Sequence, residues 1–387
     1  PSVIIIPIAN EGGRIMQERI NKLIKLMGEF EMPGIALNPG PTLNYLTGLN
    51  FHLMERPTVL LITAGGGTAL VLPALETGKL AHIPIKIEAF TYSDDPQTRP
   101  EAFFRAAEHL DLGSTDLGVE ATRMRYLEMM YLGDVLGEAG FLDASACLAG
   151  LRMTKDETEV EKMRQAAIIA QNALLETLKG IKAGMTEKEV ANQLIIHLLS
   201  AGSGPELPFS PIVAFGENSA NPHSTPSDRM LKEGDLLLVD WGASFEGYLS
   251  DITRTFTFGE VDPELLKIGE IVLHANQAGR AAGRAGIEAG FVDRATRAVI
   301  EEAGYGAAFT HRTGHGLGME AHEEPYIFEN NARILEPGMT FTVEPGIYLA
   351  SKGGVRIEDN VVVTETGLET LTDLPRQVLP LESFMGL

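Results

Sequence analysis

The sequence has a single cysteine, few basic residues relative to acidic ones, and no long apolar run. Cys147 is the only cysteine among 387 residues, which excludes an intramolecular disulfide and a zinc site built from several thiolates. It stands among small and apolar residues, so we expect a buried structural thiol. The 31 Lys and Arg against 53 Asp and Glu give a net charge of -22. Such a surface repels phosphate backbones and anionic membranes, which argues against nucleic acid or a membrane as partner.

No stretch of the sequence approaches the roughly 18 consecutive apolar residues that span a bilayer. The short apolar run Val3–Ile8 has no basic flank and does not have the pattern of a targeting signal. We therefore expect a cytoplasmic protein. Its length exceeds that of one ordinary hydrophobic core, which predicts two domains.

The N-terminal part of the chain alternates between strand and helix patterns. Apolar runs at 58–63 and 68–72 flank the segment Ala64–Gly67, which predicts a strand, a turn and a second strand. Apolar residues at helical spacing predict helices over 101–110 and 124–136. The glycine run lacks the Lys-Ser/Thr of a phosphate-binding loop, so we interpret it as a hairpin turn.

The pattern changes near residue 150, which predicts a domain of residues 1–150 and a second of residues 151–387. The segment Thr154–Glu157 has the spacing of a capping box and predicts the start of a long helix that ends near Gly180. A similar signal at Thr186–Glu189 predicts a second helix.

Strand patterns dominate after Gly234, with helical stretches only at about 263–285 and 292–303. Strands and helices do not alternate strictly in this part of the chain. We therefore expect an α+β domain whose mixed, mainly antiparallel sheet carries its helices on one side.

Two hairpin patterns in this region each contain a pair of acids. An apolar strand ends in Asp240, and the return strand begins near Asp251. A turn centred between Phe245 and Glu246 places these two acids opposite each other. In the second pattern, a turn centred at Ser351 places Glu344 opposite Glu358 in the same way, although a slip of one residue would turn a side chain to the other face. The register is therefore the feature of both hairpins that the sequence determines least.

Opposed carboxylates destabilise a sheet, and burying them among apolar residues is costly unless they are neutralised. The basic residues nearby in sequence are Arg254, Lys352 and Arg356, and only the two arginines lie within strands. Bound cations are the more economical explanation. For either hairpin alone, two solvent-facing acids in a coincidental arrangement are an equally good interpretation.

Four histidines lie close to these patterns in sequence. His315 lies among the glycines of Gly314–Gly318, His311 precedes it and His322 follows it, while His223 lies in a polar loop. Each of them alone is more often a hydrogen-bonded structural residue. One imidazole with four carboxylates, however, is an oxygen-rich set that suits manganese or cobalt, with zinc also possible. Four negative charges match two divalent ions.

The order Asp240, Asp251, His315, Glu344, Glu358 resembles the pita-bread metallopeptidase family, which includes aminopeptidase P, prolidase and methionine aminopeptidase. The resemblance covers the chain from about residue 151 to its C-terminus and rests on the strings Val239-Asp240-Trp241-Gly242-Ala243, Ser250-Asp251-Ile252-Thr253-Arg254-Thr255, Gly314-His315-Gly316-Leu317-Gly318, Val343-Glu344-Pro345-Gly346 and Arg356-Ile357-Glu358-Asp359. The first 150 residues resemble the creatinase-like N-terminal domain of this family only in length and alternating pattern. Aminopeptidase P and prolidase carry that domain, whereas methionine aminopeptidases generally lack it.

The resemblance implies a site for two divalent metal ions, with manganese favoured over cobalt or zinc. Asp251 and Glu358 would bridge the two ions. Asp240 would complete the ligands of one ion, and His315 with Glu344 those of the other.

The resemblance also implies roles around the substrate. His223 and His322 match histidines that contact the scissile carbonyl and stabilise the tetrahedral intermediate, and Glu344 would shuttle protons. His311 and Arg356 match positions that support the ligands or contact the substrate.

The resemblance implies hydrolysis of Xaa-Pro bonds in small peptides with proline in second position, and a homodimer because the family is often dimeric. Dipeptidase and aminopeptidase specificity both stay open. An alternative is a non-peptide C–N hydrolase of the same fold, such as a creatinase-like or ectoine hydrolase-like enzyme, although creatinases depart from the five-ligand set. A non-catalytic binding module is the third possibility, and the intact ligand set argues against it.

Overall fold

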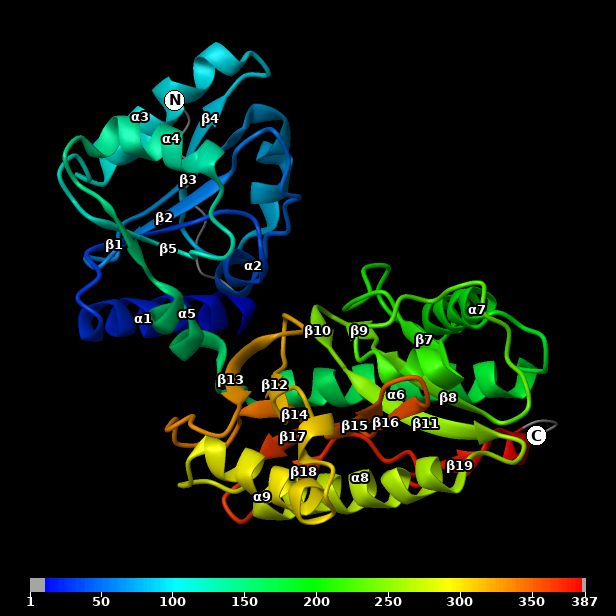
Figure 1. The fold of residues 1–387 in the computed structure, drawn as a ribbon. Helices are drawn as coiled ribbons and strands as arrows, with labels where there is room; N and C mark the ends of the chain where they lie inside the picture. The colour runs from blue at the N-terminus through cyan, green and yellow to red at the C-terminus, as the bar shows by residue number, and fades with distance from the viewer. Residues whose placement is uncertain (1–10, 385–387) are drawn as a thin grey trace. The chain divides into compact units, whose positions relative to one another are not determined.

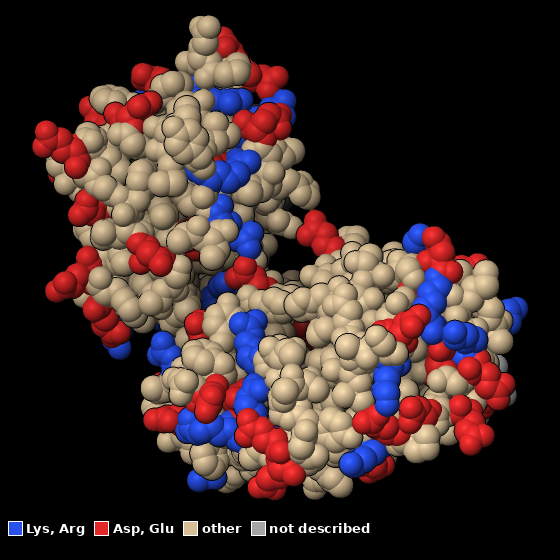
Figure 2. Space-filling model, viewed as in Figure 1, with Lys and Arg blue, Asp and Glu red and all other residues tan. Residues whose placement is uncertain are grey.

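The computed structural model describes residues 11–384, so the apolar run Val3–Ile8 lies outside the described residues. The chain divides into two compact units, Pro1–Arg152 and Met153–Leu387, and each is described here by itself. The sequence pattern predicted the change two residues earlier. None of the helices in the described part of the chain is long and apolar enough to cross a membrane. Acidic side chains are spread over the visible face of both units and are interspersed with basic ones (Figure 2).

The first unit has a six-stranded mixed sheet between two helical layers (Figure 1). Its strands, in spatial order, are β4 (Glu88–Tyr92), β3 (Thr68–Pro73), β2 (Val59–Thr63), β1 (Gly34–Leu37), β5 (Leu117–Val119) and β6 (Phe141–Asp143). One layer contains α1 (Glu11–Glu29) and α5 (Ser145–Arg152), and the other contains α3 (Arg99–His109) and α4 (Tyr126–Leu136). The short helix α2 (Pro41–Thr47) follows β1.

Several predictions for this unit are confirmed. The hairpin predicted around the glycine run is β2–β3, which are antiparallel, and Gly66 at its turn has a φ of 86°, which favours glycine. The two predicted helices are α3 and α4. Cys147 is fully buried in α5.

The second unit contains two larger sheets and two short ribbons. The four-stranded sheet has the order β19 (Leu379–Pro380), β11 (Ile252–Phe258), β8 (Asp235–Trp241), β7 (Ile212–Phe215). The five-stranded sheet has the order β13 (Glu323–Ile327), β12 (Gly314–Gly316), β14 (Thr340–Val343), β17 (Asp359–Val363), β18 (Leu368–Thr370). The ribbons pair β9 (Ser244–Phe245) with β10 (Tyr248–Leu249), and β15 (Gly346–Leu349) with β16 (Gly353–Arg356). Among the described strands of this unit only β11 and β19 pair in parallel, which confirms the mainly antiparallel α+β prediction.

Two helix pairs pack against these strands. They are α6 (Glu157–Gly180) with α7 (Glu187–Ser200), and α8 (Pro263–Ala282) with α9 (Ala289–Glu302) (Figure 1). Val239 and Trp241 of β8 are buried in the same core as α6, and the Trp241 indole donates to the Ala170 carbonyl at 2.8 Å. Side chains alternate along a strand, so Asp240 projects from the face of β8 opposite to α6.

The capping box at the start of α6 differs from the predicted one. Thr154 forms an isolated bridge with Met339, a residue far along the chain, so it is extended and cannot cap the helix. The helix begins two residues later, where Asp156 accepts from the backbone N–H of Glu159. The second predicted box, Thr186 with Glu189, is confirmed at the start of α7.

The register of the first acidic hairpin was wrong. Thr253, rather than Asp251, pairs with Asp240 across β8 and β11. The turn is a two-residue turn with Glu246 at φ 47° and Gly247 at φ 83°, so its centre lies one residue later than predicted. Turns with both central residues at positive φ match the twist of antiparallel strands. Asp251 stays on the same face as Thr253 because the offset is two residues.

The register of the second hairpin is confirmed. Gly346 pairs with Arg356 and Val343 pairs with Asp359, so the β15–β16 and β14–β17 strand pairs share a centre at Ser351. Between these two pairs, Glu344 and Glu358 occupy equivalent places in the two chain segments.

Candidate active site

One cavity of the second unit, with a volume of about 750 Å³, is lined by every residue that the sequence singled out for chemistry. These residues are His223, Asp240, Asp251, His311, His315, His322, Glu344, Arg356 and Glu358. They come from β8, β12 and β16, from the loop between β7 and β8, and from the segments next to β11, β12, β13, β14 and β17. The same cavity is also lined by Phe209, Ser210, Ile212, Thr225 and Arg312, which the sequence did not single out.

Three groups of metal-ligand type lie in the cavity: one contains Asp251, His315 and His322, and the other two share an acid. Oxygens of Asp240, Asp251 and Glu358 lie within 4.8 Å of one another. A second group, within the same limit, joins Glu358 to His315 and Glu344. Glu358 belongs to both groups, so the two ligand sets adjoin along its carboxylate.

Burial and mutual repulsion make this cluster resist ionisation. Asp251 is 5% exposed, and its pKa is raised well above the usual value by burial first and then by the charge of Glu358. Glu358 is 2% exposed, and burial followed by repulsion from Glu344 and Asp240 raises its pKa in the same direction. Burial likewise raises the pKa of Asp240, although Arg356 opposes the shift. Positive charge placed between the acids would stabilise their ionised forms and so offset both causes.

The Asp240 carboxylate supplies a direct test of whether these residues fit a cation. Its Oδ2 accepts from the Arg356 guanidinium at 2.6 Å, but its Oδ1 is buried without any hydrogen-bond partner. An unsatisfied buried carboxylate oxygen is costly. A divalent cation held by carboxylate oxygens satisfies this atom, so the residues present fit a metal.

The pKa of Glu344, beside His315, is lowered rather than raised. Burial would raise the pKa of Glu344, but its hydrogen bond to His315 and the nearby charges lower that pKa to about 2. His315 Nε2 lies 3.2 Å from Glu344 Oε1 and 3.6 Å from Asp251 Oδ2. His315 Nδ1 lies 3.1 Å from the Gly316 carbonyl, so with a metal bound an N–H at Nδ1 would donate there, and Nε2 would bind the metal in place of its hydrogen bond to Glu344.

Glycine at position 314 is required by the close approach of two strands. A Cβ at Gly314 would lie 1.8 Å from the carbonyl oxygen of Thr342 in β14. The Thr342 hydroxyl accepts from the His315 backbone N–H at 3.1 Å and donates to Glu344 at 3.2 Å. The close contact therefore fixes His315 beside Glu344.

Arg356 and Thr253 form hydrogen bonds with two of the acids, Asp240 and Glu358. The Thr253 hydroxyl donates to Glu358 Oε2 at 2.6 Å and accepts from Arg356 Nε at 3.0 Å. Arg356 also donates to the Tyr348 hydroxyl at 3.0 Å. Thr253 and Tyr348 were missed from the sequence, although the position of Thr253, two residues after Asp251, places it on the same face.

The sequence left open that Arg254 neutralises the acids of the cavity. The structure shows that it does not. It pairs with Asp359 at 2.8 Å, and Arg376 pairs with the same carboxylate at 2.7 Å. Burial would raise the pKa of Asp359, but these two guanidinium groups hold it well below its usual range. Asp359 thus anchors the strand immediately after Glu358.

The other histidines differ in how they are held. The His322 ring centroid lies 4.0 Å from that of His315, and burial followed by the charge of His315 lowers the pKa of His322 to about 4. His311 Nε2 lies 2.8 Å from the Tyr348 hydroxyl, which fixes its ring. The side chain of His223 is exposed on the cavity wall.

Comparison with known families and structures identifies the chain. The model of metallopeptidase family M24 matches residues 161–365, and the model of the creatinase/prolidase N-terminal domain matches residues 19–154. The chain belongs to metallopeptidase family M24. It is therefore a metal-dependent peptidase with a creatinase-type N-terminal domain and a pita-bread C-terminal domain, as the sequence resemblance implied.

Relatives of this M24 peptidase match it over nearly its whole length. The protein named Probable dipeptidase PepE of Mycobacterium tuberculosis is 37% identical over 355 residues, which cover 90% of this chain and 92% of the relative. The crystal structure of a dipeptidase from Pyrococcus horikoshii OT3 is 38% identical with a TM-score of 0.88, over 94% of this chain and 99% of that one. The Xaa-Pro dipeptidase from Bacillus anthracis is 32% identical with a TM-score of 0.86, over 94% and 99% of the two chains.

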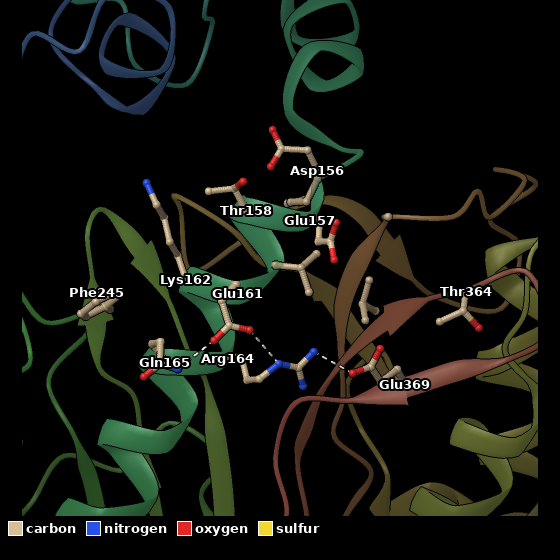
Figure 3. Close-up of a pocket in the computed structure, with 14 residues that line it drawn as sticks. Asp156, Glu157, Thr158, Glu161, Lys162, Arg164, Gln165, Phe245, Thr364 and Glu369 are labelled. Atoms are coloured by element: carbon tan, nitrogen blue, oxygen red, sulfur yellow. Dashed lines mark hydrogen bonds and ion pairs between the residues drawn. The ribbon is translucent and has the colours of Figure 1, made fainter. Parts of the chain in front are cut away.

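A second hollow of the M24 peptidase, about 660 Å³ in volume, lies along the start of α6 (Figure 3). Several of the polar side chains that line it are paired with one another. Arg164 binds Glu369 at 2.7 Å and Glu161 at 3.2 Å, and Gln165 donates to Glu161 at 2.8 Å. The metal-ligand groups found among residues 11–384 all lie in the larger cavity, so the chemistry is assigned there.

Proposed function

We propose that this M24 peptidase uses two divalent metal ions to hydrolyse Xaa-Pro bonds in small peptides, with dipeptides as its main substrates. The observation that carries the proposal is the pair of adjoining ligand groups that share Glu358, with one buried oxygen of Asp240 left unsatisfied. Two divalent ions balance four carboxylates, whereas one ion would leave excess negative charge.

Each proposed ligand has a place in this arrangement. Asp251 and Glu358 would each bind both ions. Asp240 would bind one of the two ions, and His315 and Glu344 would bind the other. The oxygen-rich set favours manganese, with cobalt or zinc as alternatives.

When bound, two such ions supply a water of lowered pKa and neutralise charge that develops on the scissile carbonyl. The pKa of Glu344 is lowered, so this carboxylate is ionised at neutral pH, and it lies beside the proposed metal ligands, where it can take a proton from the attacking water. The same carboxylate then gives that proton to the proline nitrogen as the C–N bond breaks.

The neutral His322 can donate a hydrogen bond to the carbonyl oxygen, which gains negative charge as water adds to the carbon. His223 lines the same cavity and is proposed to contact the substrate as well. Arg356 and His311 are proposed to act by holding Asp240 and Tyr348 in place.

Two considerations support proline in second position. The nitrogen of an Xaa-Pro bond carries no N–H, so a site for it needs no acceptor at that atom. The similar structure from Bacillus anthracis is that of an Xaa-Pro dipeptidase. A homodimer and a cytoplasmic location stay predictions from the sequence.

The test is an assay of the manganese-loaded protein on Ala-Pro and Ala-Pro-Ala-Ala, with products identified by mass spectrometry. Cleavage confined to the dipeptide supports an Xaa-Pro dipeptidase, whereas efficient cleavage of the longer peptide makes it an aminopeptidase P. Inactivity on both with metal bound would refute the proposal and favour a non-peptide C–N hydrolase.

Two variants assign the activity to the cavity. Asp251→Ala should abolish cleavage, because it removes a proposed ligand of both ions. Glu365→Ala, at an exposed acid outside the cavity, should leave cleavage unchanged.

A further inference from the structure

One fully buried carboxylate of the second unit lies outside the cavity and has no basic partner. Glu187 is the first residue of α7, and none of its side chain is exposed. Among residues 11–384, no basic side chain lies within ion-pair distance of it. A buried carboxylate without a counter-charge is costly unless hydrogen bonds replace those of water. The hydrogen bonds of Glu187 therefore indicate which part of the fold this acid stabilises.

The donors to Glu187 all come from one stretch of chain, residues 215–227. Its Oε2 accepts from both the backbone N–H of Ser227, at 2.9 Å, and the Ser227 hydroxyl, at 2.6 Å. Its Oε1 accepts from the backbone N–H of Phe215 at 2.7 Å and from the side-chain amide of Asn218 at 3.0 Å. Both oxygens are thus satisfied by a segment distant in sequence from α7.

The two ends of a loop meet at this carboxylate. Asn218 precedes the loop and Ser227 follows it, and both donate to Glu187. Between them, residues 222–226 all line the cavity that contains the acidic cluster, and His223 is one of these residues. Joining the ends of a loop restricts the conformations of the residues between them. Glu187 therefore restrains the wall of the cavity without being part of it.

The ring of His223 depends on this loop for its position. The backbone N–H of His223 donates to the Asn221 side chain at 3.2 Å, which is a contact within the loop. The His223 ring forms no hydrogen bond with any other residue that the structure describes. His311, in contrast, is held by the Tyr348 hydroxyl at 2.8 Å. A misplacement of about 1 Å in a group that contacts the substrate can slow a reaction by about 100-fold.

We propose that Glu187 is a positioning residue that closes the loop of residues 218–227 and thereby holds His223 against the substrate. This inference rests on the proposed function, since it takes His223 to contact the substrate. Glutamine at position 187 has nearly the same size, but it replaces one acceptor oxygen with an NH2 group. That group would face the donors of Ser227 or Asn218, so the loop would lose part of its closure.

The experiment is a double-mutant cycle on the manganese-loaded protein with Ala-Pro as substrate, using Glu187→Gln and His223→Ala singly and together. Loss of a hydrogen bond to a charged group corresponds to roughly a 10- to 100-fold change. We expect kcat/KM to fall by about this factor in Glu187→Gln. In the His223→Ala background, the same change should alter kcat/KM by less than about threefold. Glu365→Gln, at an exposed acid outside the cavity, is the matched control and should keep the wild-type value.

An equal loss in both backgrounds would mean that Glu187 acts on the fold as a whole, and it would overturn the inference while leaving the peptidase proposal intact. Wild-type kcat/KM in Glu187→Gln or in His223→Ala would overturn it as well. If Glu187→Gln does not fold, Ser227→Ala takes its place in the cycle, because it removes only the hydroxyl that donates to Glu187. The same outcomes then decide.

Hydrogen exchange tests the closure of the loop without reference to catalysis. If the wild type does not cleave Ala-Pro, the proposed function itself fails, and exchange of the backbone amides decides whether Glu187 closes the loop. In Glu187→Gln, amides of residues 218–227 should exchange about 10- to 100-fold faster than in the wild type, while those of β8 keep their rates. Equal exchange in the loop, or faster exchange throughout the unit, would refute the closure.

Discussion

Replacing Thr253 with valine should weaken metal binding without altering any proposed ligand. Thr253 is fully buried, and its hydroxyl joins Glu358 Oε2 at 2.6 Å to Arg356 Nε at 3.0 Å. Valine has nearly the same shape but no hydroxyl. The change therefore leaves a carboxylate oxygen and a guanidinium N–H without their partner in a place that water does not reach.

The magnitude follows from the hydrogen bond between the Thr253 hydroxyl and Glu358, the one of the two that reaches a proposed metal ligand. A hydrogen bond to a charged group contributes about 1.5–3 kcal/mol, and about 1.4 kcal/mol corresponds to a tenfold change in an equilibrium constant. Loss of the Thr253 hydroxyl should therefore weaken metal binding by roughly 10- to 100-fold. Residues that orient metal ligands in other proteins have effects of about this size.

The assay is a manganese titration of the metal-free protein by calorimetry, for the wild type, Thr253→Val and Thr253→Ser. Serine keeps the hydroxyl and loses only a methyl group, so Thr253→Ser should bind metal within about threefold of the wild type. Wild-type affinity in Thr253→Val, or a larger loss in Thr253→Ser than in Thr253→Val, would refute the role assigned to this hydroxyl.

Three further predictions concern the scaffold. Gly314→Ala should lower the midpoint of thermal unfolding sharply or prevent folding, because the new Cβ would lie 1.8 Å from the Thr342 carbonyl oxygen. Gly367→Ala, whose Cβ would have no atom within 4 Å, should leave the midpoint nearly unchanged. Equal midpoints for the two variants would contradict the packing described for β12 and β14. Cys147 should react with a thiol reagent only after unfolding, because it is fully buried and burial raises its pKa to about 11, and rapid labelling of the folded protein would show otherwise. Asp359→Asn should reduce the free energy of unfolding in urea by about 3–5 kcal/mol, because it leaves the buried Arg254 guanidinium and the partly buried Arg376 guanidinium without their counter-charge. A loss below about 1 kcal/mol would mean that this ion-pair network contributes little.

The residues of the cavity could be predicted from the sequence because their types and order carry the signal. The register of the second hairpin could also be predicted, since strands on both sides of Ser351 share one centre. The predicted centre of the first hairpin lay one residue too early. The reason is that Glu246 adopts a positive φ, which a sequence pattern does not require of a glutamate. The chemical roles of these residues stay proposals.

The supporting network could not be predicted because it depends on contacts between distant segments. Thr253 binds Glu358, a residue about a hundred positions away, and the Asn360 amide binds the backbone of Asp251 over a similar separation. The start of α6 was predicted two residues too early for the same reason, since Thr154 forms a β-bridge with Met339. Local spacing does not report which segments approach each other in the folded chain.

The most direct test of the central claim is the number of metal ions bound per chain. Elemental analysis of the wild type after manganese loading and removal of free metal should give two ions per chain, and Glu358→Gln should lose metal together with Ala-Pro cleavage. One ion or none in an active wild type, or two ions with full activity in Glu358→Gln, would contradict the account.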